Sequence, residues 1–166
     1  MALRKSTQAA ARVNAPSALN ASTAVVVFAE HITKTAEFAV NDVLEMIPWP
    51  AGTIPISIKA SVADLDSNGT PLVTLDFGVL SGQYLAALDD AGAARTCSTA
   101  FATASTVGQA GGVIDVASNL MLGLAPVQYD RSIGFKVAAA AATLVVGAKI
   151  QVAAQFLPVP QGVAFA

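Results

Sequence analysis

One segment in the first half of the chain alternates strictly between apolar side chains and polar or small ones. Isoleucine stands at positions 54, 56 and 58, and Ala60 and Val62 continue the series, with Thr, Pro, Ser, Lys and Ser at the positions between. Successive side chains of a β-strand point to opposite faces of a sheet, so a period of two indicates a strand with one buried face. The segment 53–62 is therefore predicted to be a strand whose apolar face turns toward a core.

Other segments carry the same signal, either as alternation or as runs of β-branched and aromatic residues. Besides 53–62, the predicted strands are 25–32, 36–41, 72–79, 113–116, 133–137, 143–146 and 148–156. Asn68-Gly69 is a turn signal, which predicts that 53–62 and 72–79 form a hairpin. Many short strands separated by turn residues are typical of a β-sandwich or a jelly roll, so the expected fold class is all-β.

One helical pattern interrupts the strands. Cys97, Phe101, Ala104 and Val107 recur at the spacing of one helix face, and Gly108 follows as a stop signal. This pattern predicts one short helix in a connection between strands.

The two ends of the chain differ from its middle. Residues 1–22 contain Arg4, Lys5 and Arg12, no acidic residue and little apolar periodicity, which predicts an extended N-terminal arm. Residues 158–166 are predicted to form an extended C-terminal tail that is still apolar and includes Phe165. The β-sandwich domain is expected to occupy 23–157, and the basic and aromatic residues of both ends are candidates for contact with other subunits.

The composition points to protein partners. Apolar residues make up 54% of the chain and charged residues 12%, against a usual charged share of about 25%. The longest apolar run, 137–148, is shorter than the roughly 20 residues of a spanning helix, so we expect no membrane. A net charge of −2 provides no basic field for nucleic acid. Burial against neighbouring subunits, including copies of the same chain, is the remaining explanation.

The sequence offers no catalytic constellation. His31 is the only histidine and lies inside a predicted strand, and Cys97 is the only cysteine. Neither a nucleophile elbow nor a phosphate-binding glycine loop is present. We therefore expect no enzyme activity and no cofactor.

Asp64, Asp66, Asn68 and Gly69 match the first half of a calcium-binding EF-hand loop. The twelfth position, where such a loop needs a bidentate Glu, is Leu75, so the motif predicts a turn, with a low-affinity cation site as the alternative.

Trp49 lies between two prolines. It is expected either to pack in the core or to anchor a subunit contact, and a sugar-binding platform is the alternative.

Several segments together resemble small structural proteins of bacteriophage virions. The resemblance rests on NDVLEMI (41–47) with the Pro-rich turn after it, ADLD (63–66), GVLSG (78–82), ASTVGQAGG (104–112), YDRSIG (129–134) and GAKI (147–150). They are similar to capsid decoration, or cement, proteins, and the similarity extends from about residue 25 to residue 156.

The resemblance implies a β-sandwich subunit on the exterior of the phage head, bound to the major capsid protein and commonly assembled as a homotrimer. Such a protein stabilises the head by bridging neighbouring capsid subunits and carries no active site. Two other classes remain open. A carbohydrate-binding or tail-associated module would expose Trp49, Tyr84 and Tyr129 together, and an enzyme would show a deep pocket lined by acids.

Overall fold

In the computed structural model, which describes residues 3–5 and 24–159, the alternating segment forms strand β4 (Thr53–Val62). The side chains of Ile58, Ala60 and Val62 are buried, as the alternation predicts. A register shift against the neighbouring strand falls between Pro55 and Ser57. Because of this bulge, the side chains in the first half of β4 point to the opposite face of the sheet from the one that the alternation predicts. Thr53 and Pro55 are therefore buried, and Ile54 and Ile56 are only partly buried.

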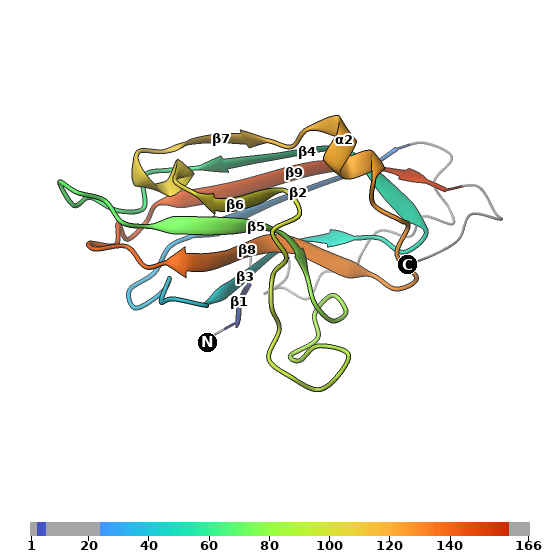
Figure 1. The fold of residues 1–166 in the computed structure, drawn as a ribbon, viewed down its shortest axis with the longest axis horizontal. Helices are drawn as coiled ribbons and strands as arrows, with labels where there is room; N and C mark the ends of the chain where they lie inside the picture. Colours follow the sequence, from blue (N-terminus) through green and yellow to red (C-terminus); the bar gives the residue numbers. More distant parts are fainter. Residues whose placement is uncertain (1–2, 6–23, 160–166) are drawn as a thin grey trace.

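Two sheets stack face to face, with their strands running along the long axis of the molecule (Figure 1). The four-stranded sheet has the order β2-β9-β4-β7 and the five-stranded sheet the order β1-β3-β8-β5-β6. The remaining elements are β1 (Leu3–Lys5), β2 (Val25–Ile32), β3 (Val43–Trp49), β5 (Thr74–Leu80), β6 (Ala102–Ser105), the 3₁₀ turn η2 (Val107–Gln109), β7 (Gly112–Asp115), α2 (Ser118–Leu122), β8 (Arg131–Ala139) and β9 (Lys149–Pro158).

The strand order defines a jelly roll. From β2 to β9 the chain changes sheet at every step except from β5 to β6, and all pairs among these eight strands are antiparallel. This is the double-sheet arrangement found in viral capsid domains and lectins. The all-β prediction is confirmed, and of its two forms the structure shows the jelly roll. Strand β1 lies outside this pattern, because it pairs in parallel with β3.

The core lies between the two sheets. Phe77 of β5 stacks on Phe135 of β8 with ring centroids 4.5 Å apart, and Phe101 packs against Phe77 at 5.4 Å. Ile150 and Phe156 of β9 face them from the other sheet and are fully buried. Burying one such side chain contributes about 1.5–3 kcal/mol, so this aromatic and aliphatic layer holds the sheets together.

The predicted hairpin between 53–62 and 72–79 is wrong. Both strands exist, but β4 and β5 belong to opposite sheets, and the connection that contains Asn68-Gly69 crosses from one sheet to the other. A turn signal reports that the chain reverses, but it does not report which strand becomes the neighbour.

The predicted helix is also misplaced. In place of a helix at 97–107 the chain forms bends, β6 and η2, because Ser98 and Phe101 donate backbone hydrogen bonds to Val79 and Phe77 of β5. Those bonds compete directly with the helical ones. The short helix of the described residues is α2 (Ser118–Leu122), in the connection between β7 and β8.

Two predicted strands are loops. In 36–41, Ala36, Phe38 and Asn41 have positive φ angles of 63°, 64° and 70°, which interrupt an extended strand. In 143–146 only Leu144 makes a bridge, to Asp66. Phe38 is nonetheless buried, so its apolar character reflects core packing in a turn.

Gly134 of β8 gives a test of this packing. It pairs with Glu45 next to a bulge in β3, and a Cβ atom there would overlap the carbonyl oxygen of Leu44. We expect Gly134→Ala to lower the free energy of unfolding by about 1–3 kcal/mol, because backbone cannot give way as a side chain does. Urea unfolding measures the change. Gly69→Ala is the matched control, because nothing lies within 4 Å of its Cβ position, and an equal effect of both substitutions would contradict this packing.

Candidate interaction surfaces

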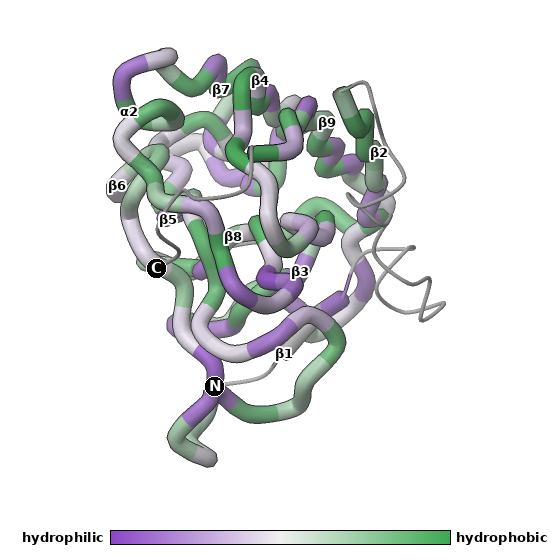
Figure 2. Tube along the Cα trace, turned by 90° about the vertical axis from the view of Figure 1, so that its right-hand side faces the viewer, coloured by the Kyte–Doolittle hydropathy of each residue, from purple (hydrophilic) through white to green (hydrophobic). Residues whose placement is uncertain are grey.

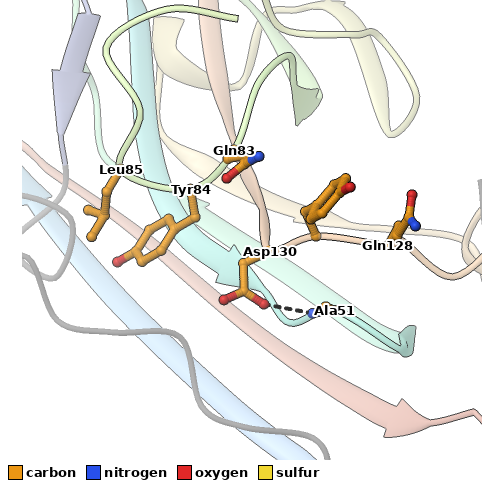
Figure 3. Close-up of a pocket in the computed structure, with 7 residues that line it drawn as sticks. Ala51, Gln83, Tyr84, Leu85, Gln128 and Asp130 are labelled. Carbon is orange, nitrogen blue, oxygen red and sulfur yellow. Dashed lines mark hydrogen bonds between the residues drawn. The ribbon is translucent and has the colours of Figure 1, made fainter. Parts of the chain in front are cut away.

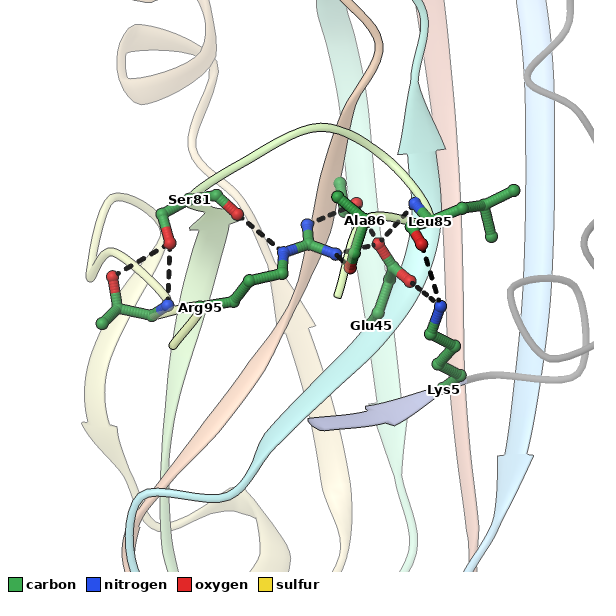
Figure 4. A network of polar contacts seen from close by, with 8 residues as sticks. Lys5, Glu45, Ser81, Leu85, Ala86 and Arg95 are labelled. Atoms are coloured by element: carbon green, nitrogen blue, oxygen red, sulfur yellow. Dashed lines mark hydrogen bonds and ion pairs between the residues drawn. The ribbon is translucent and has the colours of Figure 1, made fainter. Parts of the chain in front are cut away.

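A buried carboxylate lies at the centre of the polar contacts on one side of the sandwich. Glu45 belongs to β3, and its side chain is fully buried. Its Oε1 accepts hydrogen bonds from Nη1 of Arg95 at 2.6 Å, from Oγ of Ser132 at 2.5 Å and from the backbone N–H of Leu85 at 3.2 Å (Figure 4). One carboxylate oxygen therefore joins β3, β8 and the long loop that follows β5.

Arg95 connects this hydrogen-bond network to the loop 81–95. Its side chain is also fully buried, and three further N–H groups donate to the carbonyl oxygens of Ser81 (2.7 Å) and Ala86 (3.1 Å) and to Oγ of Ser132 (3.0 Å). Removing two charges from water is costly, so each further hydrogen bond to the donors and acceptors of a buried ion pair offsets part of that cost. The loop 81–95 folds around the guanidinium group to provide those acceptors.

The second oxygen of Glu45 faces the N-terminal strand. Oε2 is buried and accepts no hydrogen bond from the described residues, and Nζ of Lys5 lies 3.7 Å from it. Lys5 also donates to the carbonyl oxygen of Leu85 at 3.3 Å. The hydroxyl of Tyr84 is a second buried polar atom that has no hydrogen-bond partner among the described residues. Burial together with the charge of Glu45 raises the pKa of Tyr84 to about 12.

A hollow of about 450 Å³ opens beside this loop (Figure 3). It is lined by Ala51, Gln83, Tyr84, Leu85, Gln128, Tyr129 and Asp130. The carboxylate of Asp130 accepts a hydrogen bond from the backbone N–H of Ala51 at 2.8 Å, so the one acid in the lining is occupied in holding a turn. The hollow is a polar depression of the surface without a pair of carboxylates.

The three aromatic residues that would form a sugar platform are not exposed together. Trp49 is 2% exposed, and its Nε1 donates to the carbonyl oxygen of Thr53 at 3.0 Å, so it belongs to the core, the first of its two predicted placements. Tyr84 is half-buried with its hydroxyl covered, and only Tyr129 is exposed. The burial of Trp49 also removes it from the surface residues able to touch a partner.

A strip of exposed apolar side chains, interrupted by Glu30, lies on the outer face of β2, an edge strand. Glu30 forms an ion pair with Lys149 of the neighbouring strand at 3.4 Å. Val26 is 66% exposed, Phe28 51% and Ile32 43%, while Val27 and Ala29 between them are buried. Figure 2 shows this strand at the rim of the molecule with its hydrophobic segments. β2 pairs with β9 on one side only. A long apolar edge strand attracts other chains, so proteins cover such strands or protect them with charge.

The loop predicted from Asp64, Asp66 and Asn68 is organised by one carboxylate. Asp66 is buried, and its two oxygens accept the backbone N–H groups of Leu72, Thr143, Ala142 and Asn68. Burial alone would raise the pKa of Asp66, but these donors outweigh it and hold the pKa well below its usual range. The residues act here as a turn. No group of three His, Cys, Asp or Glu side chains suited to a metal occurs in the part of the chain that the structure describes.

The other sequence-predicted contact residues divide into two groups. Lys5 is described and is bound to Glu45 of its own chain, and Arg4 lies on β1 with a side chain that the structure does not describe. Arg12 and Phe165 lie outside the described residues. Glu45 was not among the predicted site residues, although an acid within the apolar run 43–47 indicates a buried charge. Arg95 has no such signal in its sequence surroundings.

Cys97 is a core residue. It packs with Val43 and Leu80, and burial raises the pKa of its thiol to about 12, which suits a small apolar role and not a nucleophile.

Solved structures show what the chain is related to. A chain in the structure "Capsid of Ralstonia phage GP4" is 31% identical, with a TM-score of 0.81, over 96% of this chain and 100% of that one. A chain in "Cyanophage Pam1 capsid asymmetric unit" is 22% identical, with a TM-score of 0.53, over 81% of this chain and 85% of that one, and it shares the fold. No protein-family model and no curated protein matches the chain.

The jelly-roll fold and the similarity to the capsid chain of Ralstonia phage GP4 show that this chain is a structural protein of the phage virion. The chain belongs to the family of the capsid chain from Ralstonia phage GP4. Among the described residues, none of the helices has the length and apolar character needed to cross a membrane.

The buried ion pair gives the second test. We expect Arg95→Met to lower the free energy of unfolding by about 3–5 kcal/mol, because it leaves the Glu45 carboxylate buried without its main partner. Adding Glu45→Gln should recover part of the loss. The matched control is Lys59→Met, which removes an exposed ion pair with Asp115 and should cost less than about 1 kcal/mol. Urea unfolding of all three variants measures the differences, and equal losses from Arg95→Met and Lys59→Met would contradict the role of the network.

Proposed function

We propose that the chain is a decoration protein that binds the exterior of the assembled phage head and stabilises it by bridging neighbouring major capsid subunits. The observation that carries the proposal is the similarity to the 31% identical capsid chain, which extends over 96% of this chain and 100% of that one. A head packed with DNA gains stability from any protein that binds the closed lattice and not its separated subunits, because binding shifts the equilibrium by mass action. That role requires contact surfaces and no catalytic site.

Self-association, which we propose to be a homotrimer, is supported by the apolar strip of β2. Val26 and Phe28 lie side by side on the outer face of an edge strand, where a solitary chain would leave them in water. We assign this strip to contact with a second copy, because a stable interface has an apolar core with few charges. Residues 6–22 and 158–166, with Arg12 and Phe165, are the proposed contacts with the shell.

The test uses phage heads that lack the protein. Adding the purified chain should saturate at a fixed number of copies per head and raise the temperature at which the heads release their DNA. A fluorescent DNA dye follows release during heating. Heads that bind the chain without any change in release temperature, or that do not bind it, would contradict the proposal.

A matched pair of variants connects this effect to β2. Val26→Ser combined with Phe28→Ser should yield monomers by light scattering and weaken head binding at least tenfold, because linked copies bind with avidity that single copies lack. Val113→Ser changes an equally exposed residue on β7, at the opposite edge of the same sheet, and should alter neither readout.

A further inference from the structure

Strand β1 is a short segment held at the edge of the five-stranded sheet. Its three residues pair in parallel with Val43, Leu44 and Glu45 of β3. Lys5 adds two polar contacts, to Oε2 of Glu45 and to the carbonyl oxygen of Leu85. β3 is buried along its whole length, so an uncovered β3 edge would expose backbone groups next to a buried carboxylate.

We propose that β1 is exchanged between copies of the chain, so that residues 3–5 of one subunit complete the sheet of its neighbour. The proposal rests on the self-association proposed above and names one of its contacts. Each bond that β1 makes with β3 is the same whichever copy supplies the strand. Exchange of an identical element is therefore a route to assembly that costs little free energy.

The length of chain before β2 permits the exchange. Nineteen residues, 6–24, separate Lys5 from Val25. A segment of that length can span up to roughly 60 Å when extended, at about 3.3–3.6 Å per residue. The β3 edge of an adjacent subunit would lie within that reach, because a small domain is about 30 Å across.

The position of the β3 edge supports exchange with a second copy. β2 packs against β3, so the strand that carries the apolar strip and the strand that receives β1 are neighbours in the two sheets. A neighbour that covers Val26 and Phe28 would therefore lie beside the strand whose edge receives β1. A lysine at this edge stabilises the buried carboxylate of Glu45, because Oε2 of Glu45 has no hydrogen-bond donor among the described residues.

Cysteine trapping tests the exchange. Leu3 is opposite Val43 in the pairing register, and Cα atoms of directly opposed strand residues lie within the span of a disulfide. The full chain is prepared with Leu3→Cys and Val43→Cys, and with Cys97→Ser because Cys97 packs against Val43. After mild oxidation we expect the chains to run as covalent oligomers on denaturing, non-reducing gels. Chains that run as monomers with a closed internal disulfide, or that form no disulfide, overturn the proposal.

A mixture of two single variants provides the sharper readout. Chains with Leu3→Cys are refolded together with chains with Val43→Cys, all in the Cys97→Ser background, and exchange should give a covalent dimer with one chain of each kind. Leu3→Cys mixed with Val113→Cys is the control and should give none. Light scattering of the same samples separates the two proposals: monomers in solution overturn both, whereas oligomers with only internal disulfides overturn the exchange and leave self-association standing.

Discussion

The buried pair of Glu45 and Arg95 is the contact on which one side of this jelly roll depends. Neither charge reaches water, so each needs partners from the protein itself, and these come from β3, β8 and the loop 81–95. Hydrophobic packing would hold the two sheets together without specifying where a fifteen-residue loop lies. The ion pair fixes that loop, because any other position would leave a charge buried and unpaired.

The same pair lies next to the edge where we propose that copies of the chain assemble. Lys5 approaches the remaining oxygen of Glu45, so the N-terminal strand is received at the place where the buried charge is incompletely satisfied. The neighbouring edge strand, β2, carries an exposed apolar face. A jelly roll leaves sheet edges open that a closed barrel does not, and we propose that this protein uses them as contact surfaces.

The sequence predicted most of the strands and the fold class because the relevant forces are local and periodic. The alternation at 53–62 and the β-branched run at 25–32 each specify a strand without reference to the rest of the chain. The errors arose where distant partners decide. Phe38 and Leu144 are apolar because they pack in turns, and Phe101 bonds to β5, which prevents the helix that its spacing suggests. Glu45 and Arg95 are fifty residues apart, so their pairing depends on a topology that no local pattern encodes.

The most direct test of the proposed role is a cryo-electron microscopy reconstruction of heads that have been reconstituted with the chain. We expect jelly-roll density on the outer surface of the shell, with each copy touching at least two major capsid subunits and with the β2 strip covered by a sister copy. Density inside the shell, or copies that each rest on a single capsid subunit, would contradict the proposal that this protein holds the head together by bridging.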